Sequence, residues 1–223
     1  MIEACVFDLD GVLIDSEPTW EEVRREFVRE RGGMWAPDTQ GRLMGMNSQE
    51  WASYLSRDLG VGLPPAEVAE IVVHRMAGRY RERLPLLPGA VEAVRRLAGR
   101  WPLGLASSSP RRLVDAVLTT AGLAECFAVI ISTDEVGRGK PAPDVYLAAA
   151  KRLHVAPSSC VAIEDSTNGL RSAIAAGMQA IAVPHAPYPV DPDVLLQAAL
   201  VLPTLSELTV DAVESTDRAA KRP

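Results

Sequence analysis

"FDLDGVLIDSEPTW" (7–20) places two aspartates, Asp8 and Asp10, at the end of an apolar run, with a glycine directly behind them. Side chains two positions apart on a β-strand point to the same face of the sheet. Two carboxylates on one face repel each other unless a cation or a shared proton compensates them. The stretch therefore predicts a metal site at the end of a strand.

Short apolar runs recur along the rest of the chain. Five runs have the length and branched content of buried strands: ACVFDLD (4–10), PLGLASSS (102–109), FAVIIST (127–133), CVAIEDS (160–166) and AIAVP (180–184). Amphipathic helical patterns lie between them, at about 89–100, 111–122, 143–154 and 167–176. Strands that alternate with helices indicate a parallel sheet with right-handed crossovers, and hence a doubly wound α/β fold.

The interval 16–84 breaks this alternation, because it has helical patterns and no convincing strand. It includes TWEEVRREFVRERGG (19–33) and PAEVAEIVVHRMAGRYRERL (65–84). An interval of this length is far too long for a loop inside a compact domain. We therefore expect residues 16–84 to form a helical cap domain, inserted after the first strand of an α/β core formed by 1–15 and 85–223.

Composition and charge limit the classes of function. The chain of 223 residues is 48% hydrophobic and 23% charged, as in ordinary globular proteins. Its net charge of −6 disfavours a nucleic-acid partner, since such proteins usually carry a basic surface. No segment has the roughly 20 apolar residues of a membrane span, and the acidic start does not resemble a signal peptide. The three cysteines are widely spaced and suggest neither disulfides nor a zinc site. We expect a cytoplasmic monomer with no membrane partner.

Polar side chains follow most of the predicted strands. Ligand sites of open α/β sheets lie beyond the carboxyl ends of the strands. The first predicted strand ends at Asp8 and Asp10, the second at Ser107, Ser108 and Ser109, and the fourth at Glu164 and Asp165, while Lys140 follows the third. We expect these side chains to surround one site.

The residue types at this predicted site suit phosphoryl transfer. Asp8 and Asp165 offer the hard carboxylate oxygens that Mg²⁺ prefers. The serine hydroxyls and the N–H groups at the start of the next helix can hold phosphate oxygens, and Lys140 can neutralise the charge shared by phosphate and nucleophile. Asp8 can attack phosphorus, while Asp10 can protonate the leaving oxygen and later deprotonate water.

Four motifs in this order give the chain a family resemblance. The chain resembles the haloacid dehalogenase (HAD) superfamily, in its branch with a helical cap after the first motif. The matching motifs are DLDGV (8–12), Ser107, Lys140 in KPAPD (140–144) and EDSTNG (164–169). The resemblance covers nearly the whole chain. It implies a Rossmann-like core, a cap that acts as a lid, and a small phosphorylated substrate.

The resemblance also implies roles for single residues. Asp8 would be the nucleophile and Asp10 the acid and base, with Lys140 as the cation beside them. Mg²⁺ would be held by Asp8, the main-chain carbonyl of Asp10 and Asp165, with Glu164 supporting. A catalytically inactive binding protein is disfavoured because these residues are intact.

Within the superfamily, DGVLIDSEPTW (10–20) with LPLLPG (84–89) is similar to the sugar-phosphate and hexitol-phosphate phosphatases, whose neighbours are the β-phosphoglucomutases. A mutase usually has a histidine at the place of Trp20, and a cap arginine where this chain reads GMNSQEW (45–51). We therefore expect no clamp for a second phosphate in the cap. A Mg²⁺-dependent phosphatase of a sugar or polyol phosphate is favoured, with a β-phosphoglucomutase-like isomerase as the alternative.

Two cap positions, Glu17 and Asn47, are expected to contact the substrate. They lie at the hinge and in a polar cap loop, and specificity residues tend to lie in loops. Trp20 and Trp51 are interpreted as packing residues of the cap rather than as a wall of the substrate site.

Overall fold

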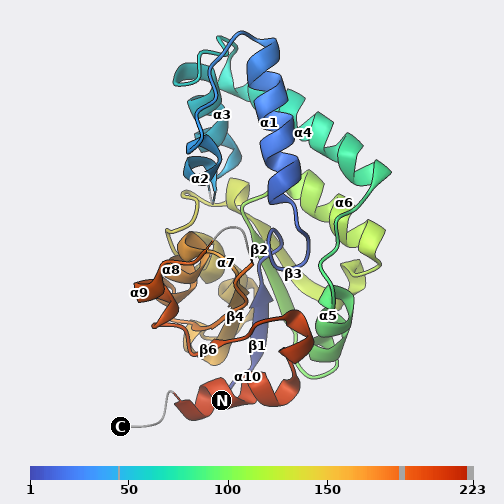
Figure 1. The fold of residues 1–223 in the computed structure, drawn as a ribbon. Helices are drawn as coiled ribbons and strands as arrows, with labels where there is room; N and C mark the ends of the chain where they lie inside the picture. Colours follow the sequence, from blue (N-terminus) through green and yellow to red (C-terminus); the bar gives the residue numbers. More distant parts are fainter. Residues whose placement is uncertain (45, 186–188, 220–223) are drawn as a thin grey trace.

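The computed structural model describes residues 1–44, 46–185 and 189–219. Within them, a parallel sheet of six strands has the order β3-β2-β1-β4-β5-β6 (Figure 1). The strands are β1 (Ala4–Phe7), β2 (Leu103–Ser107), β3 (Phe127–Ser132), β4 (Cys160–Glu164), β5 (Gln179–Ala182) and β6 (Leu200–Val201). The predicted doubly wound α/β fold is confirmed, and β6 is a strand that the sequence did not reveal.

Helices cover both faces of the sheet. They are α5 (Ala90–Ala98), α6 (Arg111–Ala121), α7 (Asp144–Leu153), α8 (Thr167–Ala175), α9 (Pro192–Leu195) and α10 (Val210–Ala219). On one face, Val6 and Ala162 pack with α7, α8 and α9. On the other, Phe7 and Ile163 pack with α5, α6 and α10. Strands buried on both faces need continuous apolar runs, which explains the sequence pattern.

Between β1 and α5 the described chain forms four helices and contributes no strand to the sheet. These are α1 (Glu17–Glu30), α2 (Thr39–Leu43), α3 (Ser48–Arg57) and α4 (Pro65–Glu82). They stand beyond the carboxyl ends of the strands (Figure 1), and α4 packs against α1 and α3. The apolar cluster under α5 and α6 continues into these helices through Phe27 and Leu55. Division into domains at residues 16 and 84 stays a prediction.

The two segments that join these helices to the sheet run side by side. Leu87 N donates to Leu13 O at 3.0 Å, and Asp15 N donates to Pro85 O at 2.8 Å. Helix α1 begins two residues after Asp15. The pairing therefore holds the first turn of α1 above the loop that follows β1.

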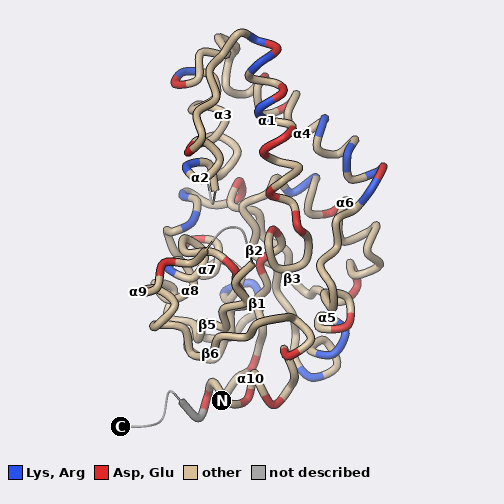
Figure 2. Tube along the Cα trace, in the orientation of Figure 1, with Lys and Arg blue, Asp and Glu red and all other residues tan. Residues whose placement is uncertain are grey.

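Charged residues of both signs are spread along the helices (Figure 2). Ion pairs cross from α4 to α1, with Arg75 2.6 Å from Glu30 and Arg79 3.2 Å from Glu22. These pairs are solvent-exposed, so each contributes little to stability. Among the described helices, none combines the length and apolar character needed to cross a membrane.

Candidate active site

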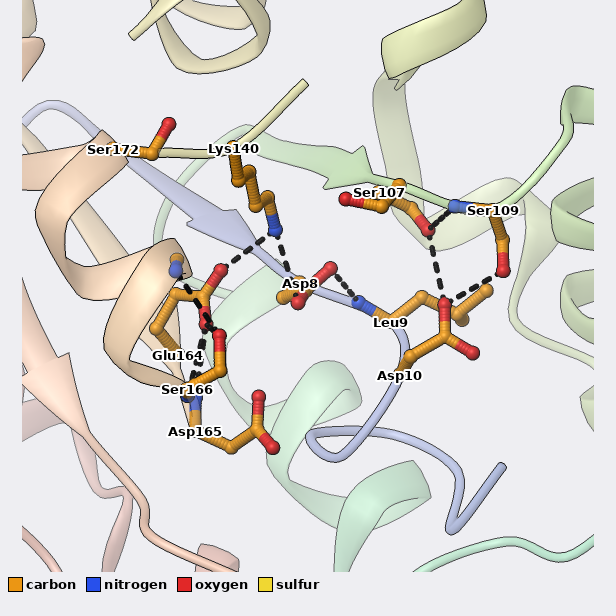
Figure 3. Close-up of polar contacts among 12 residues, drawn as sticks. Asp8, Leu9, Asp10, Ser107, Ser109, Lys140, Glu164, Asp165, Ser166 and Ser172 are labelled. Carbon is orange, nitrogen blue, oxygen red and sulfur yellow. Dashed lines mark hydrogen bonds and ion pairs between the residues drawn. The ribbon is translucent and has the colours of Figure 1, made fainter. Parts of the chain in front are cut away.

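The carboxyl ends of the strands bring the predicted residues to one pocket. From the core, its lining consists of Asp8, Asp10, Ser108, Ser109, Lys140, Asp165 and Ser166. Ser107 and Glu164 lie behind this lining, fully buried, and both hydrogen-bond to residues that line it (Figure 3). The convergence expected from the strand ends is therefore present.

Asp8 contacts Lys140 and the N–H of Leu9 (Figure 3). Because β1 pairs in parallel with β4, Asp8 stands beside Glu164 at the end of the sheet. Lys140 Nζ lies 3.0 Å from Asp8 Oδ2 and 2.6 Å from Glu164 Oε1. The N–H of Leu9 donates to Asp8 Oδ1 at 2.7 Å. One buried lysine thus holds two buried carboxylates.

Burial makes the carboxylates of Asp8 and Asp165 costly to ionise. Burial raises the pKa of Asp8 well above its usual value; Lys140 opposes this rise, and the charge of Glu164 adds to it. Burial, and then the charges of Glu164 and Asp8, raise the pKa of Asp165 in the same way. A cation close to both groups would favour their ionised forms. The electrostatics thus favour a bound metal.

Glu164 is satisfied by donors on both of its oxygens. Tyr146 Oη donates to Oε1 at 2.8 Å, beside the bond from Lys140, and Ser166 Oγ donates to Oε2 at 3.1 Å. Burial would raise the pKa of Glu164, but Lys140 and these hydrogen bonds outweigh it and lower the pKa. Gly169 permits the contact with α8, since a Cβ there would lie 1.9 Å from Glu164 Cδ. Tyr146 is a residue that sequence reasoning missed.

Asp10 is held by three hydroxyl groups. Ser16 Oγ donates to Oδ1, while Ser109 Oγ and Ser107 Oγ donate to Oδ2 at 2.8 and 3.3 Å. Ser107 Oγ also accepts from the N–H of Ser109 at 3.0 Å. Ser107 therefore orients Asp10, whereas Ser108 lines the pocket. Contact of either serine with phosphate stays a prediction.

The acidic cluster fits a divalent cation. Asp8, Glu164 and Asp165 each offer an oxygen, and these oxygens lie within 4.8 Å of one another. Buried hard oxygen ligands suit Mg²⁺. Gly11, with a φ of +77°, lets the backbone approach Asp165, because a Cβ there would lie 1.9 Å from Asp165 Oδ2. The ligand roles of these residues, and of the Asp10 carbonyl, stay predictions.

The inserted helices close the other side of the pocket. Glu17, Trp20 and Arg24 of α1 line it with Trp51 of α3, since positions three and four apart share one helix face. Gln40 Nε2 donates to Glu17 Oε2 at 2.5 Å. Burial raises the pKa of Glu17 to about 7, although the charge of Arg24 opposes the rise. The two tryptophans are buried and in contact, as interpreted, but they also form part of the pocket wall.

Arg24 is a cation of the inserted helices that lines the pocket and that sequence reasoning missed. Its side chain is buried, and its guanidinium carbon lies 4.2 Å from the Trp20 ring centroid and 5.1 Å from that of Trp51. Burial lowers the pKa of Arg24 to about 10, so the group stays charged at neutral pH. The sequence held a signal, because Arg24 lies four residues after Trp20 and three before Phe27, on the apolar face of α1.

Asn47 is not among the residues that line this pocket. Its side chain accepts from Glu50 N at 2.9 Å, and Glu50 Oε2 accepts from Asn47 N at 2.8 Å, which forms a capping box at the start of α3. The next residue, Ser48, donates from N and Oγ to the two carboxylate oxygens of Asp134, at 3.0 and 2.8 Å. Substrate contact by Asn47 stays a prediction.

Known proteins resemble this chain in sequence and in fold. The sequence profile of the haloacid dehalogenase-like hydrolases matches residues 2–177. Hexitol phosphatase B of Escherichia coli (strain K12) is 38% identical over 214 residues, covering 93% of this chain and 95% of that protein. Fructose-1-phosphate phosphatase of the same organism is 31% identical over 180 residues, covering 80% of this chain and 94% of that protein.

Solved structures agree with this relationship. CbbY of Rhodobacter sphaeroides in complex with phosphate has a TM-score of 0.84 at 29% identity, covering 96% of this chain and 100% of that one. β-Phosphoglucomutase of Clostridium difficile has a TM-score of 0.85 at 24% identity over 100% of both chains, a likeness of fold. From the matched family profile, the two phosphatase sequences and the shared architecture, it follows that the chain belongs to the haloacid dehalogenase-like hydrolases.

Proposed function

We propose that the protein is a phosphatase that hydrolyses a small sugar phosphate or polyol phosphate through an aspartyl-phosphate on Asp8. The observation that carries the proposal is the buried Asp8 carboxylate, held by Lys140 and facing a pocket that Asp10 also lines. Relatives named as hexitol and fructose-1-phosphate phosphatases support this class of substrate.

The residues divide the reaction into two half-reactions. In the first, a carboxylate oxygen of Asp8 attacks phosphorus, the bond from phosphorus to the substrate oxygen breaks, and Asp10 gives a proton to that oxygen. In the second, Asp10 takes a proton from water as the water oxygen attacks phosphorus, and the bond to Asp8 breaks. Inorganic phosphate then leaves. Lys140 offsets negative charge in both steps.

The proposed metal is Mg²⁺, with Asp8, the main-chain carbonyl of Asp10 and Asp165 as its protein ligands and Glu164 in support. When bound, the ion supplies the positive charge that lets a phosphate dianion approach buried carboxylates. The raised pKa values of Asp8 and Asp165 support this role, because burial leaves these carboxylates poorly compensated. Glu164 supports the site by holding Lys140.

We also propose a cap at 16–84 that closes over the pocket, and a cytoplasmic monomer. The hydrogen bonds from Ser48 to Asp134 support closure, since they join α3 to the loop after β3. The three unpaired cysteines fit a reducing compartment.

A β-phosphoglucomutase-like isomerase is the second candidate, and Arg24 is the observation that favours it. A mutase must hold a second phosphate in the cap while the first is transferred. Arg24 supplies a cation there, but Glu17 lines the same pocket with a carboxylate. The charge that Glu17 carries above its raised pKa would oppose a second phosphate, and the named relatives are sugar phosphatases, so the phosphatase is the better supported function.

Two assays run side by side separate the candidates. One measures phosphate release from sorbitol 6-phosphate and glucose 6-phosphate with Mg²⁺. The other measures formation of glucose 6-phosphate from β-glucose 1-phosphate in the presence of glucose 1,6-bisphosphate. We expect phosphate release and no isomerisation. Isomerisation that outpaces phosphate release would overturn the phosphatase and establish the isomerase.

A further inference from the structure

The pocket has two chemically different sides. On the core side lie Asp8 and Lys140, where the proposed function puts the phosphate. On the side of the inserted helices, α1 presents Glu17 and Arg24, and neither takes part in the two half-reactions. Helix α1 stands directly beyond the end of β1 (Figure 1), so a substrate held at Asp8 extends toward this helix.

Arg24 has unused donor capacity. The residue is 5% exposed, and its Nε has no hydrogen-bond partner within the described residues. The guanidinium stacks against the indole of Trp20, and no carboxylate in the described part of the chain forms an ion pair with it. The terminal guanidinium nitrogens of Arg24 also have no acceptor among the described residues, and Arg24 lines the pocket, so these nitrogens are left to donate to a ligand there.

Glu17 is the complementary acceptor in the same part of the pocket. Its Oε2 accepts from Gln40 at 2.5 Å, and no described residue donates to Oε1. Glu17 and Arg24 are spaced seven residues apart on α1, which puts them two turns apart on one helix face. The pocket thus presents a donor and an acceptor along one helix, with the indoles of Trp20 and Trp51 beside them.

We propose that Arg24 and Glu17 form a subsite for the hydroxyl-bearing carbon chain of the substrate, in which Arg24 donates to hydroxyl oxygens and Glu17 accepts from hydroxyl protons. This subsite rests on the proposed phosphatase function and narrows its substrates to polyhydroxylated monophosphates. A hydroxyl both donates and accepts, so it satisfies both partners. The C–H groups of such a chain suit the apolar wall to which Trp20 and Trp51 contribute.

A second anionic group fits this subsite less well. The charge of Glu17 is the largest of the influences that raise the pKa of Arg24 against burial, and Asp10 adds to it. The guanidinium charge is therefore already offset by carboxylates on the same side of the pocket. Ionised Glu17 would repel a carboxylate or phosphate placed there, whereas a hydroxyl can donate to the ionised carboxylate and accept from the protonated one.

The test compares three substrates of equal chain length: sorbitol 6-phosphate, n-hexyl phosphate without hydroxyls, and 6-phosphogluconate with a terminal carboxylate. Arg24→Met keeps the unbranched side chain but removes the donors. We expect the ratio of kcat/KM for sorbitol 6-phosphate over hexyl phosphate to fall about 10- to 100-fold, mainly through KM. Arg24→Lys, which keeps the charge without the planar fork, should lower the ratio less. Arg25→Met, at an exposed neighbouring position, is the matched control and should leave the ratio unchanged.

Each failure has its own signature. The subsite would be overturned if kcat/KM fell equally for sorbitol 6-phosphate and hexyl phosphate in Arg24→Met and Arg24→Lys. It would also be overturned if kcat/KM fell for neither substrate. A parent preference for 6-phosphogluconate that Arg24→Met abolishes would replace the hydroxyl subsite with an anion subsite. A parent enzyme that releases phosphate from hexyl phosphate but from no sugar or polyol phosphate would instead overturn the proposed function. Thermal unfolding of each variant identifies any that fail to fold.

Discussion

Replacement of Lys140 by methionine tests the polar network at its centre. Lys140 Nζ lies 3.0 Å from Asp8 Oδ2 and 2.6 Å from Glu164 Oε1, and all three side chains are buried. At an effective dielectric constant near 20, each contact is an attraction of about 5–6 kcal/mol. Burial of the lysine itself costs free energy, so the net loss of stability is smaller than the sum of these two attractions. We expect Lys140→Met to lower the free energy of unfolding by about 3–5 kcal/mol, because it leaves buried carboxylates without their cation.

Urea unfolding in a chelating buffer measures this loss without a contribution from bound metal. Lys151→Met, at an exposed position on α7, is the control and should change stability by less than about 0.5 kcal/mol. Phosphate release by Lys140→Met with Mg²⁺ should also fall by about 100-fold or more. A stability loss below about 1 kcal/mol would refute the view that Lys140 compensates two buried charges.

Three further predictions concern the metal, the pH dependence and the closed cap. Excess chelator should abolish phosphate release and Mg²⁺ should restore it, so full activity in chelator would contradict the metal site. The pKa of Glu17 is raised from 4.5 to about 7 in the folded protein, so between these values the folded protein binds more protons than the unfolded chain. Glu17 therefore lowers the free energy of unfolding as pH rises through this range, by up to about 3 kcal/mol. Urea unfolding should show that Glu17→Gln gains stability relative to the parent from about pH 4.5 to 7.5. A difference in the free energy of unfolding that stays constant over this range would contradict the raised pKa of Glu17. Asp134→Ala removes two exposed hydrogen bonds to Ser48, so KM should rise about two- to tenfold while kcat changes little; an unchanged KM would show that these bonds do not hold the cap closed.

The core of the fold was predictable because its strands are buried on both faces. Such strands have continuous apolar runs, and the five predicted strands appear as β1 to β5. Strand β6 was missed because it has two residues, Leu200 and Val201, and lies at the sheet edge, where little burial marks it. The helices of 16–84 were predictable from their periodicity. Their position relative to the sheet was not, because it depends on packing across the apolar cluster that these helices share with α5 and α6.

The site was predictable where its residues follow strands, and less so where they come from helices. Asp8 and Lys140 stand out by position, whereas Tyr146 meets Glu164 only because α7 covers the face to which β4 directs that carboxylate. Arg24 could have been found as the one cation on the apolar face of α1. The capping box at Asn47 was likewise predictable from the sequence, because Glu50 follows Asn47 by three residues.

The attack of Asp8 on phosphorus is tested most directly by phosphate release from sorbitol 6-phosphate with Mg²⁺, by the parent and by Asp8→Asn. The amide keeps the shape of the side chain but is a poor nucleophile and a weaker metal ligand. Asp115→Asn, on the outer side of α6, is the control and should match the parent. We expect phosphate release to fall about 1000-fold or more in Asp8→Asn. Activity of that variant within about tenfold of the parent would contradict it.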